Sequence, residues 1–234
     1  MPTDVERIRD LANRIARVPA VPGALHVLRE YRLQANVVAD FEPQWGSVAR
    51  QIAGRAGCAF VRLHRDNVNA GHYLGDEAWR TRQNLIAALS TTDDPAGSPG
   101  SGDLSLPGQS SLIFVQLKRH IPGAQSDIVQ AASGQVASVR VFSIKVGAEG
   151  QFERLWTQSA QAEAHQIGCL FKRLYADLNL PTRYVSYSLW ADATAPEEAA
   201  SKHTHWQKQH PPYPLGSPVI RAYYEVRANV IGSE

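Results

Sequence analysis

The longest segment of this sequence with one clear period runs from residue 152 to residue 180. Its apolar side chains recur at steps of three and four residues, which places them on one stripe of an α-helix. The stripe consists of Phe152, Leu155, Trp156, Ala160, Ile167, Leu170, Phe171, Leu174 and Leu178. Pro181 ends the periodic segment, because proline cannot continue a helix. A helix with one apolar stripe needs a partner, and runs with strand character on both sides predict that this partner is a sheet.

Four runs with strand character surround the predicted helix. Apolar and β-branched residues dominate residues 111–119, 136–147 and 183–191, as is typical of strands. In residues 218–231 apolar and polar side chains alternate, which indicates a strand with one face on the core and the other toward water or a partner. The sequence therefore predicts an α+β fold, an antiparallel four-stranded sheet covered by one long helix.

The preceding part of the chain is predicted to be rich in helix and to contain a β-α-β unit. The expected elements are helices over residues 3–18, 23–33, 46–57 and 77–90 and strands over residues 36–41 and 58–65. Gly, Ser, Pro, Thr and Asp dominate residues 91–110, a composition typical of a linker or a long loop. We therefore predict an α-rich part over residues 1–90, a linker or loop over residues 91–110 and an α+β domain over residues 111–234.

Composition and charge restrict the cellular setting. The chain is 44% hydrophobic and 20% charged, which is ordinary for a globular protein. Its two cysteines, Cys58 and Cys169, lie inside apolar runs, so we expect buried thiols in a reducing compartment. The first residues mix charges of both signs, and no run of 18 apolar residues occurs. We expect a cytoplasmic or virion protein that is not secreted by a cleaved signal and does not contact a membrane.

One polar stretch could carry catalytic chemistry. His64, Asp66, Asn67 and His72 follow the expected strand at residues 58–65 and could converge at its carboxyl end. The same composition is typical of a loop rich in turn-forming residues, and we favour that interpretation. The sequence contains no nucleophile elbow and no H-E-x-x-H motif. We therefore assign no catalytic residue, expect no cofactor and consider a non-enzymatic role the better prediction.

A second polar stretch, residues 192–217, contains three histidines at short spacing. His203, His205 and His210 are the best metal candidates, because imidazoles close together in a loop can share one ion. The loop also carries side chains suited to phosphate or base contacts. Together with arginines elsewhere, the predicted nucleic-acid or partner contacts are Arg119, Lys202, Trp206, Lys208, Arg221 and Arg227. An exposed loop between two strands is the simpler interpretation of residues 192–217.

The order strand, strand, helix, strand, strand over residues 111–232 resembles that of the tail-terminator and neck-completion proteins of tailed phages. The resemblance implies a non-enzymatic structural subunit of a phage-tail-like particle. It also implies a homo-oligomeric ring whose partners are neighbouring particle subunits. The alternative that the arginines and the histidine loop favour is a nucleic-acid-binding or processing protein. A metal- or histidine-dependent enzyme is the third possibility.

Overall fold

The computed structural model describes residues 25–90, 109–123, 134–196, 199 and 211–232. The chain divides into two compact units. Unit 1 comprises Met1–Gln116 and Arg227–Glu234, and unit 2 comprises Leu117–Val226. Among the described residues, no helix has the length and the apolar character needed to cross a membrane.

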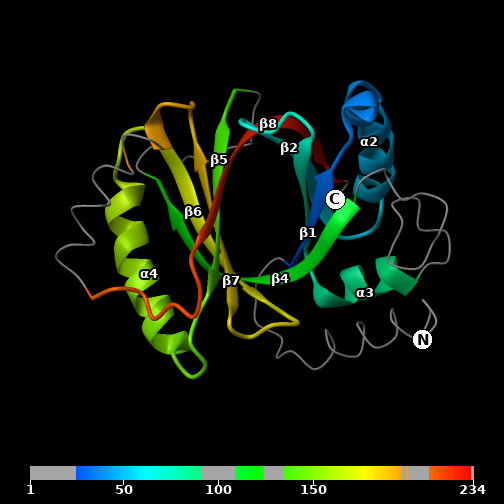
Figure 1. The fold of residues 1–234 in the computed structure, drawn as a ribbon. Helices are drawn as coiled ribbons and strands as arrows, with labels where there is room; N and C mark the ends of the chain where they lie inside the picture. The colour runs from blue at the N-terminus through cyan, green and yellow to red at the C-terminus, as the bar shows by residue number, and fades with distance from the viewer. Residues whose placement is uncertain (1–24, 91–108, 124–133, 197–198, 200–210, 233–234) are drawn as a thin grey trace. The chain divides into compact units, whose positions relative to one another are not determined.

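Unit 1 is a sheet with strand order β4, β1, β3, β2, β8, in which β1 pairs antiparallel with β3 and β4, and β2 with β3 (Figure 1). Its strands are β1 (Leu25–Arg32), β2 (Cys58–Asp66), β3 (His72–Trp79), the first part of β4 (Gln109–Pro122) and the last part of β8 (Ile220–Ile231). Helices α2 (Val38–Ala53) and α3 (Arg82–Ser90) lie on one face, and the 3-10 helix η1 (Ala35–Val37) precedes α2.

Helix α2 packs on this sheet through one apolar stripe. Its buried residues are Phe41, Trp45, Val48, Ala49, Ile52 and Ala53, and they recur at steps of three and four. The rings of Phe41 and Tyr73 lie 4.8 Å apart, between centroids, so the helix contacts the start of β3. Burial of each large apolar side chain contributes about 1.5–3 kcal/mol to folding.

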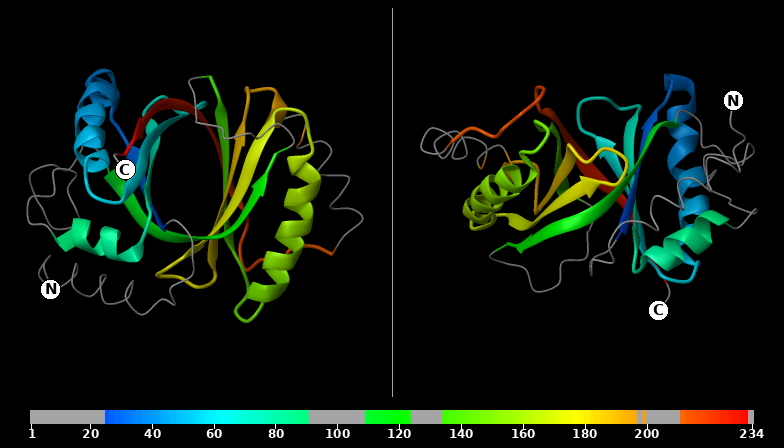
Figure 2. Two further views of the ribbon diagram at one scale, coloured as in Figure 1. Left: turned by 180° about the vertical axis from the view of Figure 1, so that it is seen from behind. Right: turned by 90° about the horizontal axis from the view of Figure 1, so that it is seen from below.

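Unit 2 is a sheet with strand order β8, β5, β7, β6, β4. Its own strands are β5 (Val136–Ser143), β6 (Cys169–Asp177) and β7 (Arg183–Trp190), and β7 pairs antiparallel with both β5 and β6. Helix α4 (Glu149–Ala164) covers one face of this sheet, as the views in Figure 2 also show. The core beneath it is built on Phe142, Phe152, Trp156, Leu174 and Tyr184.

The two units are copies of one pattern, in which β5, α4, β6 and β7 begin 111 positions after β1, α2, β2 and β3. Residues of the same type at this offset are Phe41 and Phe152, Trp45 and Trp156, Gly57 and Gly168, Cys58 and Cys169, Asp66 and Asp177, Tyr73 and Tyr184, and Trp79 and Trp190. Gly57 and Gly168 both adopt a positive φ, 79° and 83°, which glycine alone adopts without strain. The chain therefore contains an internal repeat, which the sequence-based prediction missed.

The predicted fold class was wrong. The predicted helix over residues 152–180 is the helix α4 followed by the strand β6. Nearly every position of β6 is buried, so its apolar residues do not alternate, and a helical period fitted them equally well. For the same reason the predicted helix over residues 23–33 is the strand β1, in which His26 and Arg29 are buried.

Other elements of the first 90 residues also differ from the prediction. Residues 36–41, expected as a strand, belong to η1 and α2, so the expected β-α-β unit does not form, and β2 pairs antiparallel with β3. Residues 72–79, expected as a loop and the start of a helix, form β3. The predicted helix over residues 3–18 and nearly all of the predicted linker lie outside the described residues. The strands predicted at residues 58–65, 111–119, 183–191 and 218–231 are confirmed.

Candidate functional site

A row of polar side chains crosses the sheet of unit 2 beneath α4. Ser188 on β7 is the register partner of both Ser138 on β5 and Lys172 on β6. Side chains at partnered positions point to the same face of a sheet, and Trp190, two residues after Ser188, shares this face. All three members of this polar row are buried, with 2–3% of each residue exposed. A buried row of this kind requires hydrogen-bond partners or a ligand.

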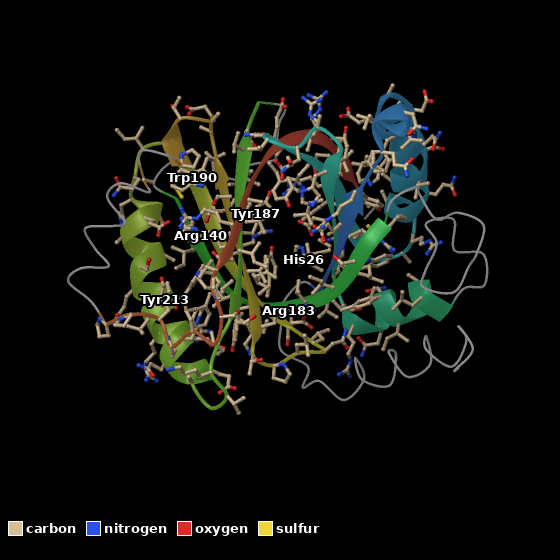
Figure 3. All side chains as sticks on the ribbon, viewed as in Figure 1. His26, Arg140, Arg183, Tyr187, Trp190 and Tyr213 are labelled. Atoms are coloured by element: carbon tan, nitrogen blue, oxygen red, sulfur yellow. The ribbon has the colours of Figure 1, made fainter. Side chains whose placement is uncertain are left out.

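Helix α4 places a carboxylate over the polar row. Glu163, in the last turn of α4, accepts a hydrogen bond from the Lys172 ammonium, and Ser159 donates to it over 3.2 Å. The guanidinium of Arg140 lies 3.7 Å from the same carboxylate. Arg140, Glu163 and Lys172 form the charged cluster of unit 2. Figure 3 shows Arg140 and Trp190 on the side of the sheet that faces α4.

The surroundings of the charged cluster change its acid-base properties. Burial lowers the pKa of Lys172, although the Glu163 carboxylate acts in the opposite direction. Burial raises the pKa of Tyr213, whose hydroxyl bonds to Ser159, to about 12. Burial also raises the pKa of the neighbouring Cys169 thiol to about 11. At neutral pH the cysteine and the tyrosine are therefore neutral, and the ionisable groups of the site are Glu163, Lys172 and Arg140.

Two polar atoms beside the cluster have no hydrogen-bond partner in the described part of the chain. These atoms are the Ser138 hydroxyl oxygen and the indole nitrogen Nε1 of Trp190. Both residues are buried, Ser138 at 2% exposed and Trp190 at 1% exposed. The Lys172 ammonium lies 5.9 Å from the centre of the Trp190 ring. Buried donors without a partner are rare and require an explanation, such as a bound water. The indole nitrogen of Trp79, the equivalent of Trp190 in unit 1, has no partner in the described residues either.

The equivalent row in unit 1 is different. Glu77 on β3 stands between Val27 on β1 and Val61 on β2, so one carboxylate replaces the central serine and two valines flank it. Arg29 donates to Glu77 over 2.5 Å, and both side chains are buried. A small hollow lined by Arg29, Tyr31, Trp45, Gly75 and Glu77, among others, lies beside this pair. It has room for about one water molecule.

The first polar stretch had two interpretations, a favoured loop rich in turn-forming residues and a convergent catalytic site, and the structure brings Asp66 and His72 together. His64 is fully buried, and one of its ring nitrogens, Nδ1, lies 3.0 Å from the carbonyl oxygen of Leu74. Asp66 accepts hydrogen bonds from the backbone N–H groups of Val68 and Asn69 and contacts His72 over 3.0 Å. In unit 2 the equivalent Asp177 makes the same turn contacts and pairs with Arg183. These residues therefore shape a hairpin, as the favoured loop interpretation implied, although residue 72 onward is strand.

The predicted metal and contact residues are only partly described. His203, His205, His210, Lys202, Trp206 and Lys208 lie outside the described residues. Arg119 pairs with Glu153 over 3.4 Å, and Arg227 donates to Glu42 over 3.2 Å, so each arginine binds a carboxylate of a helix in its own unit. Arg221 is exposed on β8. Contacts with metal, nucleic acid or partner proteins stay predictions.

The polar row was missed because its residues carry no motif. Glu163 and Lys172 lie within the segment predicted as one long helix, whereas they belong to α4 and to β6. The signal that could have found them is the repeat. At the offset of 111 residues, Ile52 becomes Glu163, Val61 becomes Lys172 and Val27 becomes Ser138, so polar residues replace three apolar residues at buried positions.

Solved structures with the same fold cover nearly the whole chain. The structure is similar to that of an anthrone oxidase-like protein, with a TM-score of 0.68 and 14% sequence identity, over 92% of this chain and 98% of that chain. It is also similar to a candidate monooxygenase from Fusobacterium nucleatum, with a TM-score of 0.66 and 9% identity over 89% of this chain and 94% of that chain. A candidate monooxygenase from Lactobacillus acidophilus gives a TM-score of 0.63 and 10% identity over 89% and 96%. At these identities the similarity shows a shared fold.

Sequence comparison adds one match, and it falls in unit 2. A sequence model of the family described as antibiotic biosynthesis monooxygenase matches residues 135–211. This range contains the whole polar row and the charged cluster. The search of curated proteins gave no match.

These comparisons contradict the resemblance to phage tail-terminator and neck proteins. The predicted role as a structural subunit of a phage-tail-like particle was wrong, and no finding supports a virion location. The resemblance rested on element order alone, and that order is shared by antiparallel α+β folds of unrelated function. The chain instead has the fold of monooxygenase-like proteins, and its residues 135–211 are similar to the antibiotic biosynthesis monooxygenase family.

Proposed function

We propose that this protein is a monooxygenase-like oxidoreductase that oxidises an enolisable or phenolic aromatic substrate with molecular oxygen. The reaction takes place in unit 2, between the sheet and α4. One observation carries the proposal: the stretch similar to the monooxygenase family is also the stretch that holds the buried polar row and the charged cluster. Unit 1, which the family model does not match, has valines at two of the three row positions.

The charged cluster supplies the groups that such a reaction uses. Oxidation by oxygen is easier for a deprotonated substrate, because an anion gives up electrons more readily than the neutral molecule. The Glu163 carboxylate is placed to accept the proton, as a general base. The positive charges of Lys172 and Arg140 stabilise the anion that forms in a site shielded from water. For an anthrone, one CH₂ group and one O₂ give one C=O group and one water.

The proposal is tested by oxygen consumption with the full-length chain. An anthrone is the first substrate to try, because a structure with the same fold is described as anthrone oxidase-like. Oxygen uptake and quinone formation are followed together, with and without added flavin, nicotinamide cofactor or metal ions. We expect one oxygen consumed for each quinone formed, above the rate with heat-denatured protein. Rates equal to that background for anthrones and for simple phenols would refute the proposal.

Matched variants locate the reaction. Glu163→Gln should lower the turnover by about 100-fold, the usual contribution of a general base. Glu77→Gln changes a buried carboxylate of unit 1 and should leave turnover within about threefold of the unchanged chain. Circular dichroism and thermal unfolding show whether each variant is folded. Equal losses for both variants would place the reaction outside the site of unit 2.

A further inference from the structure

We infer that unit 1 contains a clasp that closes and opens with the protonation of one histidine. The clasp consists of His72 at the start of β3, Asp66 at the end of β2 and Glu30 on β1. It holds the three strands together while the His72 ring carries two protons, and it releases Glu30 when one proton leaves. None of these residues belongs to the site in unit 2, so the inference is independent of the proposed function.

Both ring nitrogens of His72 face a carboxylate. Nε2 lies 2.7 Å from Oε1 of Glu30, and Nδ1 lies 3.0 Å from Oδ2 of Asp66. Burial raises the pKa of each carboxyl group, but the hydrogen bonds that each accepts lower its pKa below the ordinary value, so both are ionised at neutral pH. An ionised carboxylate only accepts hydrogen bonds. A closed clasp therefore requires both nitrogens to donate, which only the cationic ring does.

Unit 2 has a permanent cation at the equivalent position. Arg183 replaces His72 and pairs with Asp177, as His72 pairs with Asp66. Arginine stays charged at every physiological pH. The equivalent of Glu30 is Val141, so unit 2 has one carboxylate here and unit 1 has two. The repeat therefore keeps a cation at this position, and only in unit 1 is it one that a proton switches.

The surroundings determine which contact of the clasp opens. The Asp66 side chain is 7% exposed and accepts hydrogen bonds from two backbone N–H groups of its own turn, over 2.7 and 3.0 Å. The Glu30 side chain is 24% exposed and turns toward water more easily. A neutral His72 therefore keeps its proton on Nδ1, facing Asp66. Nε2 then becomes an acceptor facing the carboxylate of Glu30, and two acceptors at this distance repel each other.

Release of Glu30 affects the start of β4. Ser111 donates to Oε2 of Glu30 over 3.0 Å, and the pairing of β1 with β4 is irregular between Glu30 and Tyr31. Arg32, the other described charged side chain that contacts the clasp, donates to Glu30 over 3.0 Å and is exposed. It therefore follows the carboxylate into water. An open clasp loosens the start of β4 against β1, while the turn between β2 and β3 stays closed.

The first test observes the protonation of His72 directly. The full-length chain is labelled with ¹⁵N on its histidines, and the signals of His72 are those that disappear in His72→Arg. Histidine side chains usually titrate between pH 5 and 8, whereas burial lowers the pKa of His64 to about 4. At about pH 5.5 both ring nitrogens of His72 should carry a proton, and at about pH 8.5 only Nδ1 should. Any other pattern would overturn the inference.

The second test measures amide hydrogen exchange, corrected for the intrinsic effect of pH on the exchange rate. From about pH 5.5 to about pH 8.5, protection of residues 111–113 should fall about tenfold, the effect of losing one hydrogen bond to a charged group. The amides of Val68 and Asn69, which bond to Asp66, should keep their protection. A loss of equal size at these two amides would overturn the inference.

Matched variants connect the loss of protection to the clasp. His72→Arg introduces the residue of unit 2 and should keep the start of β4 protected at both pH values. Glu30→Gln should do the same, because an amide donates to a neutral ring and accepts from a charged one. His165→Gln, which removes an exposed histidine of unit 2, should leave the tenfold fall unchanged. An equal fall in His72→Arg, or no fall in the unchanged chain, would contradict the clasp.

Discussion

In unit 1 a glutamate, Glu77, stands between two valines on neighbouring strands, whereas in unit 2 the same position is Ser188, between Ser138 and Lys172. Two residues after Val27 and two residues after Ser138 both units have the same residue, an arginine, Arg29 and Arg140. Its carboxylate partner comes from a strand in unit 1 and from a helix in unit 2. Moving the carboxylate to the helix leaves the middle of the sheet to a lysine and two hydroxyl groups.

The positions that both units share are those the fold needs. The paired tryptophans and phenylalanines of α2 and α4 fill the space between helix and sheet. On the opposite face Arg62 and Arg173 each lie 4.4 Å above a phenylalanine ring of the same strand. Among the buried positions that differ are Ile52 and Glu163, Val61 and Lys172, and Val27 and Ser138. The repeat therefore separates residues that build the fold from residues available for chemistry, within one chain.

The largest expected effect concerns the buried ion pair of unit 1. Glu77→Leu removes the carboxylate that Arg29 contacts and should lower the free energy of unfolding by about 3–5 kcal/mol, since it leaves a buried charge. The double variant Arg29→Met/Glu77→Leu should recover most of that loss. In unit 2, Arg140→Met leaves Glu163 paired with Lys172 and should cost only about 1 kcal/mol.

Urea unfolding of the full chain measures these differences. Thermal unfolding of each variant is the control, because it shows whether the variant still unfolds in one two-state transition. A double variant as unstable as Glu77→Leu alone would show that Arg29 and Glu77 do not act as a pair. A cost for Arg140→Met as large as that for Glu77→Leu would show that the two clusters are equivalent after all.

The second effect is a dependence of stability on pH that belongs to unit 1. Burial, with Arg62 nearby, lowers the pKa of His64 from 6.5 to about 4, although Asp76 acts in the opposite direction. The unfolded chain therefore binds more protons than the folded chain between these pH values, and stability falls as the pH falls through this window. The loss is about 3 kcal/mol when complete. The equivalent residue of unit 2 is Tyr175, so unit 2 has no histidine at this position.

His64→Tyr copies the residue of unit 2 and should remove this dependence. Urea midpoints at pH 7, 6, 5 and 4 compare the variant with the unchanged chain. Burial raises the pKa of Asp76, but His26, with smaller effects of Arg62 and His64, lowers it to about 2. The variant loses only the smallest of these effects, that of His64, so Asp76 keeps most of its contribution in both chains. It loses that contribution only as the pH falls below about 4. Parallel pH profiles for the two chains would contradict the assignment to His64.

The elements that could be predicted from the sequence are those whose side chains alternate between apolar and polar, or whose ends carry turn-forming residues. The strand over residues 218–231 has one exposed face, and its alternation was visible without the structure. Strands β1 and β6 are buried on both faces, so local periodicity could not distinguish them from helices. The polar row depends on register between three strands, and register is not a local property of the sequence. The repeat was detectable, because Gly57, Cys58 and Trp79 recur at one offset.

The smallest expected effect tests whether the shared framework is energetically the same in both units. Tyr73 donates to Glu42 over 3.2 Å, and the equivalent Tyr184 donates to Glu153 over 3.1 Å. Tyr73→Phe and Tyr184→Phe each remove one hydrogen bond to a carboxylate and should each cost about 1 kcal/mol. Urea unfolding of both variants should give losses within about 0.5 kcal/mol of each other, and the double variant should show their sum. A loss confined to one variant would mean that the two hydrogen bonds have equal geometry but contribute unequally to the free energy of unfolding. The repeat would then preserve the shape of the framework without preserving its stability.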